Sequence, residues 1–173
     1  MKKLFLIFAA MLIATAAVAQ TAEQNYQKGV EAYEADKKNE AVSFFQKAAN
    51  QGHAVAQALL GVCYYEGDGV AQNKRKAVEW YQRAAEQGIA EAQSALGACY
   101  AHGEGVAQNM QKAAEWWQKA AEQGDDEAQY NLGVCYYNGD GVAQNKQTAI
   151  EWLKKAAEQR DEAAIEILKE IGK

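Results

Sequence analysis

The feature of this sequence that most limits its fold is a repeat of 36 residues. Gly61, Gly97 and Gly133 are separated by 36 positions each. Repeats of this length are typical of solenoids, in which each unit packs mainly against its neighbours along the chain. Leucine, alanine and tryptophan keep the same period, at Leu60, Leu96 and Leu132, at Ala77, Ala113 and Ala149, and at Trp80, Trp116 and Trp152.

Each 36-residue unit has the pattern of two helices. In the first unit we expect a helix over 54–65, where apolar residues recur at helical spacing. A second helix is expected over 74–87, with Asn73 as its N-cap and Gly88 as the residue that ends it. The chain contains no proline. We therefore expect an all-α chain of stacked helix pairs that bury one another's apolar faces.

The two ends of the chain depart from the 36-residue pattern. In an earlier unit Ala41 follows Tyr33 by only eight positions, whereas Ala77 follows Tyr65 by twelve, so the loop of the earlier unit is shorter. At the other end, one amphipathic helix without a partner suits a cap on the last unit. These patterns predict repeats at 22–53, 54–89, 90–125 and 126–160, followed by a capping helix at 161–171.

Residues 1–19 have the three parts of a secretory signal peptide. Lys2 and Lys3 form a basic start, an apolar stretch follows, and small residues at 17–19 form a cleavage site. We expect a mature chain of residues 20–173 with no membrane span after cleavage. Without the two lysines the chain has 16 basic and 23 acidic side chains, a net charge of −7. This charge argues against nucleic acid as a partner.

Two sequence patterns carry a family resemblance. They are A-x-x-x-L-G-x-x-Y-x-x-G-x-G-V, read from Ala56, and A-x-x-W-x-x-x-A-A-x-x-G, read from Ala77, and many of their positions recur in three registers. They resemble the Sel-one-like repeat (SLR), a branch of the tetratricopeptide superfamily with a longer inter-helix loop. The first unit, with its short loop, is similar to an ordinary tetratricopeptide repeat. The resemblance implies a right-handed α-solenoid of one short tetratricopeptide-like repeat, three SLR repeats and the capping helix.

The resemblance also implies a function. The family usually provides adaptors or scaffolds for other proteins, and exported bacterial members have been linked to envelope assembly and to host interaction. We therefore expect a non-catalytic scaffold that binds a protein or peptide, in the bacterial periplasm or secreted. Two alternatives remain: an enzyme acting on cell-wall material or β-lactams, as described for cysteine-rich relatives, and a secreted factor acting on host cells. The sequence names neither the partner nor the oligomeric state.

Few residues are suited to catalysis or metal binding. The mature part has two serines, Ser43 and Ser94, and neither begins an S-x-x-K signature. His53 and His102 have no ligand partner at metal-binding spacing, so we expect both at the surface or in loops. We therefore expect no catalytic residue, no cofactor and no metal.

One cysteine occupies the same helix position in each unit, at Cys63, Cys99 and Cys135. Equivalent helices of stacked repeats lie about 8–10 Å apart, whereas a disulfide needs Cα atoms about 4.4–6.8 Å apart. We therefore expect three small buried side chains without bridges between repeats. The cysteine-rich relatives carry two cysteines per repeat, which pair within it, and this chain departs from that pattern.

Tyrosines are the candidate binding residues. Tyr64, Tyr100 and Tyr136 belong to the apolar stripe and are expected in the core. A second set of tyrosines stands one position after the core tyrosine of a repeat, or seven residues before that position. These tyrosines lie on a different face of the first helices. That face is expected to line a concave peptide groove; the alternative is that its rings pack between repeats. The groove residues are Tyr26, Tyr33, Tyr65, Tyr130 and Tyr137.

The loop inside each unit carries a Gly-acid-Gly motif, as at 67–69. It matches neither a phosphate loop nor a calcium loop, since Val70 and Gln72 stand where a calcium loop would have an acidic residue or Asn. We expect it to be the hinge of the repeat, because glycine adopts backbone angles that other residues resist.

Overall fold

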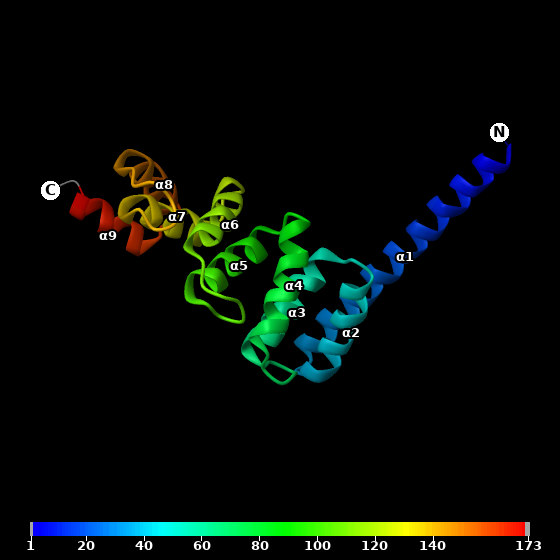
Figure 1. The fold of residues 1–173 in the computed structure, drawn as a ribbon. Helices are drawn as coiled ribbons and strands as arrows, with labels where there is room; N and C mark the ends of the chain where they lie inside the picture. Colours follow the sequence, from blue (N-terminus) through cyan, green and yellow to red (C-terminus); the bar gives the residue numbers. More distant parts are fainter. Residues whose placement is uncertain (1, 172–173) are drawn as a thin grey trace. The chain divides into compact units, whose positions relative to one another are not determined.

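The structure is a computed structural model that describes residues 2–171, with side chains from Thr15 onward except that of Ala16. All regular structure in this range is helical, which confirms the prediction of an all-α repeat fold (Figure 1). Met1 and the side chains of residues 2–14, which carry most of the predicted signal peptide, lie outside the described part. The helices are α1 (Lys2–Glu34), α2 (Lys38–Asn50), α3 (Ala54–Glu66), α4 (Lys74–Glu86), α5 (Ala90–His102), α6 (Met110–Glu122), α7 (Asp126–Asn138), α8 (Lys146–Glu158) and α9 (Glu162–Ile171).

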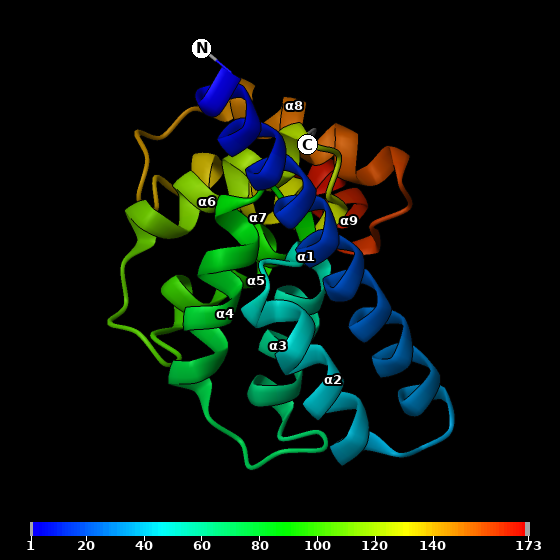
Figure 2. The same cartoon turned by 90° about the vertical axis from the view of Figure 1, so that its right-hand side faces the viewer.

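The chain divides into two compact units, residues 1–73 and 74–173. In the first unit α1 packs along α2, and α2 packs against α3 (Figure 2). In the second unit each helix from α4 to α9 packs against the next one in the chain. Contacts between successive helices are those of a solenoid repeat. None of the described helices has both the length and the apolar content needed to cross a membrane.

The glycine at the middle of the first helix of a repeat lies where the two helices of a pair touch. A methyl group on Gly97 would lie 2.6 Å from the ring of Trp117. Gly29 is placed in the same way, with the ring of Phe45 at 2.5 Å from the position of a methyl group. The missing side chain lets a large residue of the second helix pack directly on the backbone of the first.

The Gly-acid-Gly loop has the glycine conformations expected of the hinge, and it also makes a packing contact that was not predicted. Gly67 and Gly69 do adopt left-handed angles, with φ of 79° and 69°. In addition, a Cβ atom on Gly69 would lie 2.5 Å from the backbone oxygen of Lys38, the first residue of α2. Gly105 faces the carbonyl of Lys74, and Gly141 faces that of Met110, in the same way. The loop of a repeat therefore packs on the start of the second helix of the preceding repeat.

An ion pair accompanies this loop contact at two places. Asp68 lies between the two glycines of its loop, and its Oδ1 is 2.9 Å from Nζ of Lys38. Glu104 and Lys74 form the equivalent pair in the second unit, at 2.6 Å. The third contact has Met110 in place of the lysine, so it lacks this pair. We call the glycine contact and its ion pair the loop clamp.

The predicted core is largely confirmed. Leu60, Leu96 and Leu132 are almost fully buried. The tyrosines expected in the core are only partly buried, and Tyr100 and Tyr136 pack against the buried cluster of α5, α6 and α7 from its edge. Partial burial is common for this amphipathic side chain.

Candidate functional site

An apolar pocket lies between α1, α2 and α3 in the first unit. Its volume is about 260 Å³. Two of its wall residues, Tyr33 and Val62, are among the few large hydrophobic side chains that are exposed in the described part, at 44% and 46%. The wall consists of Val30, Tyr33, Glu34, Phe45, Leu59, Val62, Cys63 and Asp68. Exposed apolar surface around a hollow is the usual mark of a binding site.

The carboxylate of Asp68 fixes the Tyr33 side of this pocket. The hydroxyl of Tyr33 donates a hydrogen bond of 2.8 Å to Oδ2 of Asp68, whose Oδ1 pairs with Lys38. These contacts lower the pKa of Asp68, with Lys38 as the larger cause and Tyr33 as the second. The pKa of Tyr33 is raised, mainly because its hydroxyl donates to that carboxylate. The loop clamp therefore also fixes the ring that forms the pocket wall.

The pocket has an acidic surround. Glu34 lines it directly, and Asp68 is already paired. Glu31 lies three residues before Glu34 on α1, and Glu66 lies four residues after Val62 on α3, so each occupies a neighbouring position on the helix surface. Both of these glutamates are exposed. An occupant would meet apolar side chains inside and carboxylates at the edge.

Tyr26 belongs to a contact between helices. Its ring stacks on the ring of His53, with centroids 4.5 Å apart. Nδ1 of His53 accepts a hydrogen bond from the backbone N–H of Ala56, so Nε2 carries the proton and donates to Glu23 at 3.0 Å. His53 lies in the turn before α3, which agrees with the prediction of a surface or loop residue, and its ring also caps α3 and stacks on Tyr26.

The pKa of Glu23 is lowered by these surroundings, first by the hydrogen bond from Gln27 and then by the one from His53. The stacking of Tyr26 on His53 agrees with the alternative that a tyrosine of this set packs between repeats and does not line a groove. Tyr26 thus shapes the first unit and lies outside the wall of the apolar pocket.

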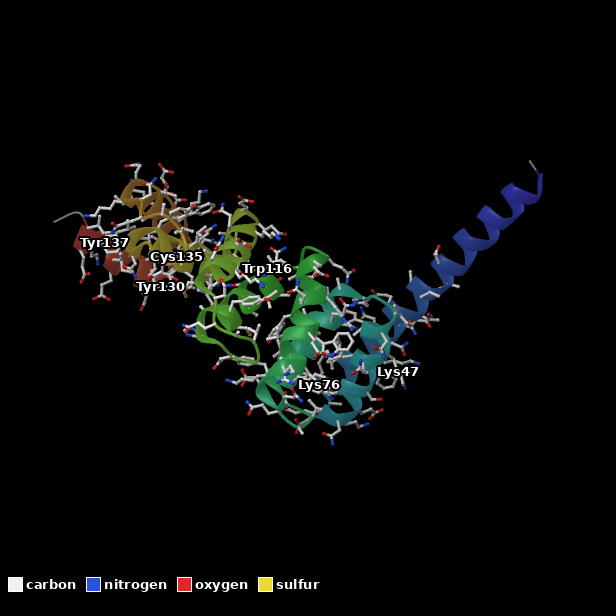
Figure 3. The ribbon with its side chains drawn as sticks, in the orientation of Figure 1. Lys47, Lys76, Trp116, Tyr130, Cys135 and Tyr137 are labelled. Atoms are coloured by element: carbon white, nitrogen blue, oxygen red, sulfur yellow. The ribbon has the colours of Figure 1, made fainter. Side chains whose placement is uncertain are left out.

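The remaining candidate tyrosines lie apart from the pocket. Tyr65 is partly buried on α3. Tyr130 and Tyr137 both project from α7 in the second unit (Figure 3). Tyr130 packs against the small core of α8 and α9, whereas Tyr137 is partly exposed. Of the five predicted groove residues, the structure places only Tyr33 in the wall of this pocket.

The three cysteines are free and buried, as predicted. Burial raises the pKa of Cys63, Cys99 and Cys135 to about 11. A thiol with such a pKa is almost fully protonated at neutral pH and is a poor nucleophile. Cys63 therefore contributes apolar surface to the pocket.

The serines and histidines do not converge in the described structure. Ser43 is exposed on α2, whereas Ser94 is buried on α5. His102 is exposed at the end of α5. Within residues 2–171 no group of three or more histidine, cysteine or acidic side chains is arranged to hold a metal ion.

The pocket itself was missed from the sequence. Its aliphatic wall residues Val30, Leu59 and Val62 stand on the first helices but do not belong to the tyrosine pattern. The available signal was the unusual size of Leu59, since Ala95 and Asn131 occupy its position in the next two repeats.

The chain is similar to proteins of a known repeat family. The family model described as Sel1 repeat matches residues 14–53, 54–89, 90–125 and 126–161. A search of curated proteins gives no match.

Several solved structures share this fold. A protective antigen of uropathogenic Escherichia coli strains that displays an SLR fold is 34% identical, with a TM-score of 0.79 over 87% of this chain and 34% of that one. A Sel1 repeat protein from Oxalobacter formigenes is 38% identical, with a TM-score of 0.75 over 81% of this chain and 56% of that one. Cysteine-rich protein B of Helicobacter pylori is 27% identical, with a TM-score of 0.58 over 71% and 93%. The chain thus spans about a third of the first protein and just over half of the second.

Proposed function

The chain belongs to the Sel1 repeat family, and we propose that it is a non-catalytic scaffold that binds a peptide segment of another protein. Repeat proteins of this kind generally bind proteins, because their stacked helices present a large continuous surface. The observation that carries the proposal is the apolar pocket of the first unit, which exposes Tyr33 and Val62 to an incoming side chain.

The pocket favours one kind of peptide. Its volume of about 260 Å³ is below the range of about 300–1,000 Å³ that is usual for small-molecule sites, and it suits one large apolar side chain. Glu34 in the wall, with Glu31 and Glu66 nearby, favours a lysine or arginine next to that anchor. We therefore assign the pocket to a peptide with an aliphatic or aromatic anchor and an adjacent basic residue.

A selection of random peptides tests this assignment. Phage-displayed heptapeptides would be selected on the wild-type chain and counter-selected on the variant Val62→Glu, which places a charge in the pocket wall. We expect enriched sequences that pair an apolar anchor with lysine or arginine and that fail to bind the variant. Enrichment of acidic sequences, or equal retention by the variant, would overturn the assignment.

We also infer that the chain is exported to the bacterial envelope and works in the periplasm, on the strength of the signal-peptide pattern at residues 1–19. Expression in a bacterium, followed by fractionation and N-terminal sequencing, tests this. The expected product is a periplasmic chain that begins at Gln20. A cytoplasmic chain that keeps residues 1–19 would refute export, and recovery from the medium would favour secretion.

The non-catalytic reading has its own check, because enzymes acting on β-lactams remain an alternative for relatives of this fold. Nitrocefin is a chromogenic β-lactam, and purified chain is expected to leave its hydrolysis at the buffer rate. Turnover that scales with protein concentration and survives in a Ser43→Ala variant would refute the proposal and point to a nucleophile other than Ser43. Turnover lost in that variant would identify Ser43 and refute the non-catalytic proposal.

A further inference from the structure

The second unit carries a hollow of opposite character, which we name the Trp116 hollow. Its volume is about 460 Å³. It is bounded by α4, α5 and α6, and Figure 3 labels Trp116 on α6. Its wall consists of Gln82, Tyr100, Lys112, Glu115, Trp116, Gln118 and Lys119. All of these residues lie in the second unit, so the hollow is independent of the apolar pocket.

Two ammonium groups and two aromatic rings meet in this hollow. Nζ of Lys119 lies 4.0 Å from the centroid of the Trp116 ring, and Nζ of Lys112 lies 5.2 Å from that of Tyr100. Both distances are within the range of cation–π contacts. Neither lysine forms an ion pair within the described part of the chain. Two positive charges therefore remain without a carboxylate partner in a chain whose net charge is −5.

The nearby carboxylates do not neutralise these lysines. Glu115 lines the hollow without reaching ion-pair distance of either ammonium group in the described structure. Glu86 and Glu122 accept hydrogen bonds from Gln82 and Gln118, at 2.6 and 2.7 Å, on their own helices. A partner carboxylate can thus pair with both lysines, while Glu115 repels any further negative charge beside it.

A cation stacked on the aromatic ring of a second helix is not in itself a site. The same stack occurs at Lys47 over Phe44, Arg83 over Trp80 and Lys155 over Trp152, so it belongs to the repeat. What marks the Trp116 hollow is a second cation, Lys112, in the wall of the same hollow; the preceding repeat has Lys76 at that position. In the last repeat Thr148 stands at the position of Lys112, so its tryptophan lacks that neighbour.

We propose that the Trp116 hollow is a second interaction surface, which binds an acidic peptide segment that carries an aromatic residue. The two lysines supply charge complementarity to its carboxylates, and Tyr100 and Trp116 supply faces for its ring. The surface is distinct from the pocket for basic-apolar peptides. Two peptide sites of opposite charge preference would let one chain hold two different partners together, as a scaffold does.

The probe is the acidic peptide acetyl-Asp-Glu-Phe-Glu-amide, compared with its uncharged twin acetyl-Asn-Gln-Phe-Gln-amide. The readout is the indole N–H signal of Trp116 in a two-dimensional ¹⁵N NMR spectrum, identified by its absence in Trp116→Phe. The acidic peptide is expected to shift this signal in a saturable manner, and its twin is not. No saturable shift at millimolar peptide, or an equal shift by the twin, would overturn the proposal.

Matched variants separate the hollow from overall charge. Lys112→Gln with Lys119→Gln is expected to weaken binding of the acidic peptide about tenfold. Lys154→Gln with Lys155→Gln removes the same charge from α8, including a lysine stacked on tryptophan, and is expected to leave the affinity within about twofold. Glu115→Gln removes the repelling carboxylate. It is expected to lower the Kd of the acidic peptide by roughly two- to fivefold. Equal losses in the two double variants, or weaker binding by Glu115→Gln, would show that the hollow does not recognise the peptide.

Discussion

Individual glycines decide how closely the repeats of this chain can approach. Gly103 and Gly105 share a φ of 72°, and both lie in the loop between α5 and α6. A Cβ atom on Gly103 would lie 3.3 Å from the side chain of Gln108, which can move aside. One on Gly105 would collide with the backbone of Lys74, which cannot. The two positions therefore separate the cost of backbone strain from the cost of losing the loop clamp.

Alanine at these two glycines should have unequal effects on stability. Both variants pay for the left-handed backbone angle, about 1–2 kcal/mol. Gly105→Ala should lose roughly a further 1–3 kcal/mol, because its methyl group forces α4 and the loop apart. Urea unfolding curves of the two variants and the wild type measure the difference. Equal free energies of unfolding for Gly103→Ala and Gly105→Ala would mean that the clamp contact is unimportant.

The ion pair of the first clamp should make stability depend on acid. The pKa of Asp68 is lowered in the folded chain, mainly by Lys38, so the charged form is favoured by folding. Its contribution is present above the unfolded pKa, about 4, and is lost as pH falls through the folded pKa. Asp68→Asn should therefore reduce the urea midpoint at pH 6 and leave it nearly unchanged at pH 2. Asp140→Asn is the control, since Met110 replaces the lysine there; a loss as large in the control would contradict the assignment.

Pairs of helices repeat with the period of the sequence, and this is why their bounds could be predicted closely. The first full repeat was expected to have helices over 54–65 and 74–87, and they span Ala54–Glu66 and Lys74–Glu86. Helical spacing and glycine stops are local signals, so they survive in one sequence. The clamp could not be predicted in this way, because it joins Gly69 to Lys38 across two repeats and depends on backbone approach.

The candidate binding pocket was predicted less well than the fold, for a related reason. Periodic positions report what every repeat shares, whereas the apolar pocket depends on residues that differ between repeats. Leu59 forms part of its wall, but Ala95 and Asn131 stand at that position further along. The tyrosine pattern includes Tyr33, which lies in the pocket wall, but it also includes Tyr26 and Tyr130, which pack against other helices.

A lysine at Met110 should complete the clamp between the last two repeats. Met110 begins α6, and Gly141 packs on its carbonyl as Gly105 packs on that of Lys74. In a double-mutant cycle of Met110→Lys and Asp140→Asn, the lysine and aspartate should show a favourable coupling of about 0.2–1 kcal/mol. The cycle cancels the packing lost with the methionine. A coupling of zero would show that the charged residue of the loop does not reach the helix start at this contact.

At the scale of the whole molecule, the repeat family of the chain and the hollows on its surface both favour a protein-binding function. The Sel1 repeats form a series of stacked helices, and the two hollows described above, one in each unit, differ in chemistry. The first hollow is apolar with acidic surroundings, and the second is aromatic with two lysines that form no ion pair among the described residues. The exposed apolar side chains of Tyr33 and Val62 around a pocket are typical of an interaction site.

The most direct test of the central claim is the affinity of a basic-apolar peptide from the phage selection, measured by fluorescence anisotropy on two variants of α3. Val62→Glu changes the pocket wall, whereas Val55→Glu places the same charge at a similarly exposed position, 40% against 46%, two helical turns away and outside the wall. We expect the Kd to rise at least about tenfold for Val62→Glu and to stay within about twofold for Val55→Glu. Equal affinities for the two variants would contradict the assignment of the pocket as the peptide-binding site.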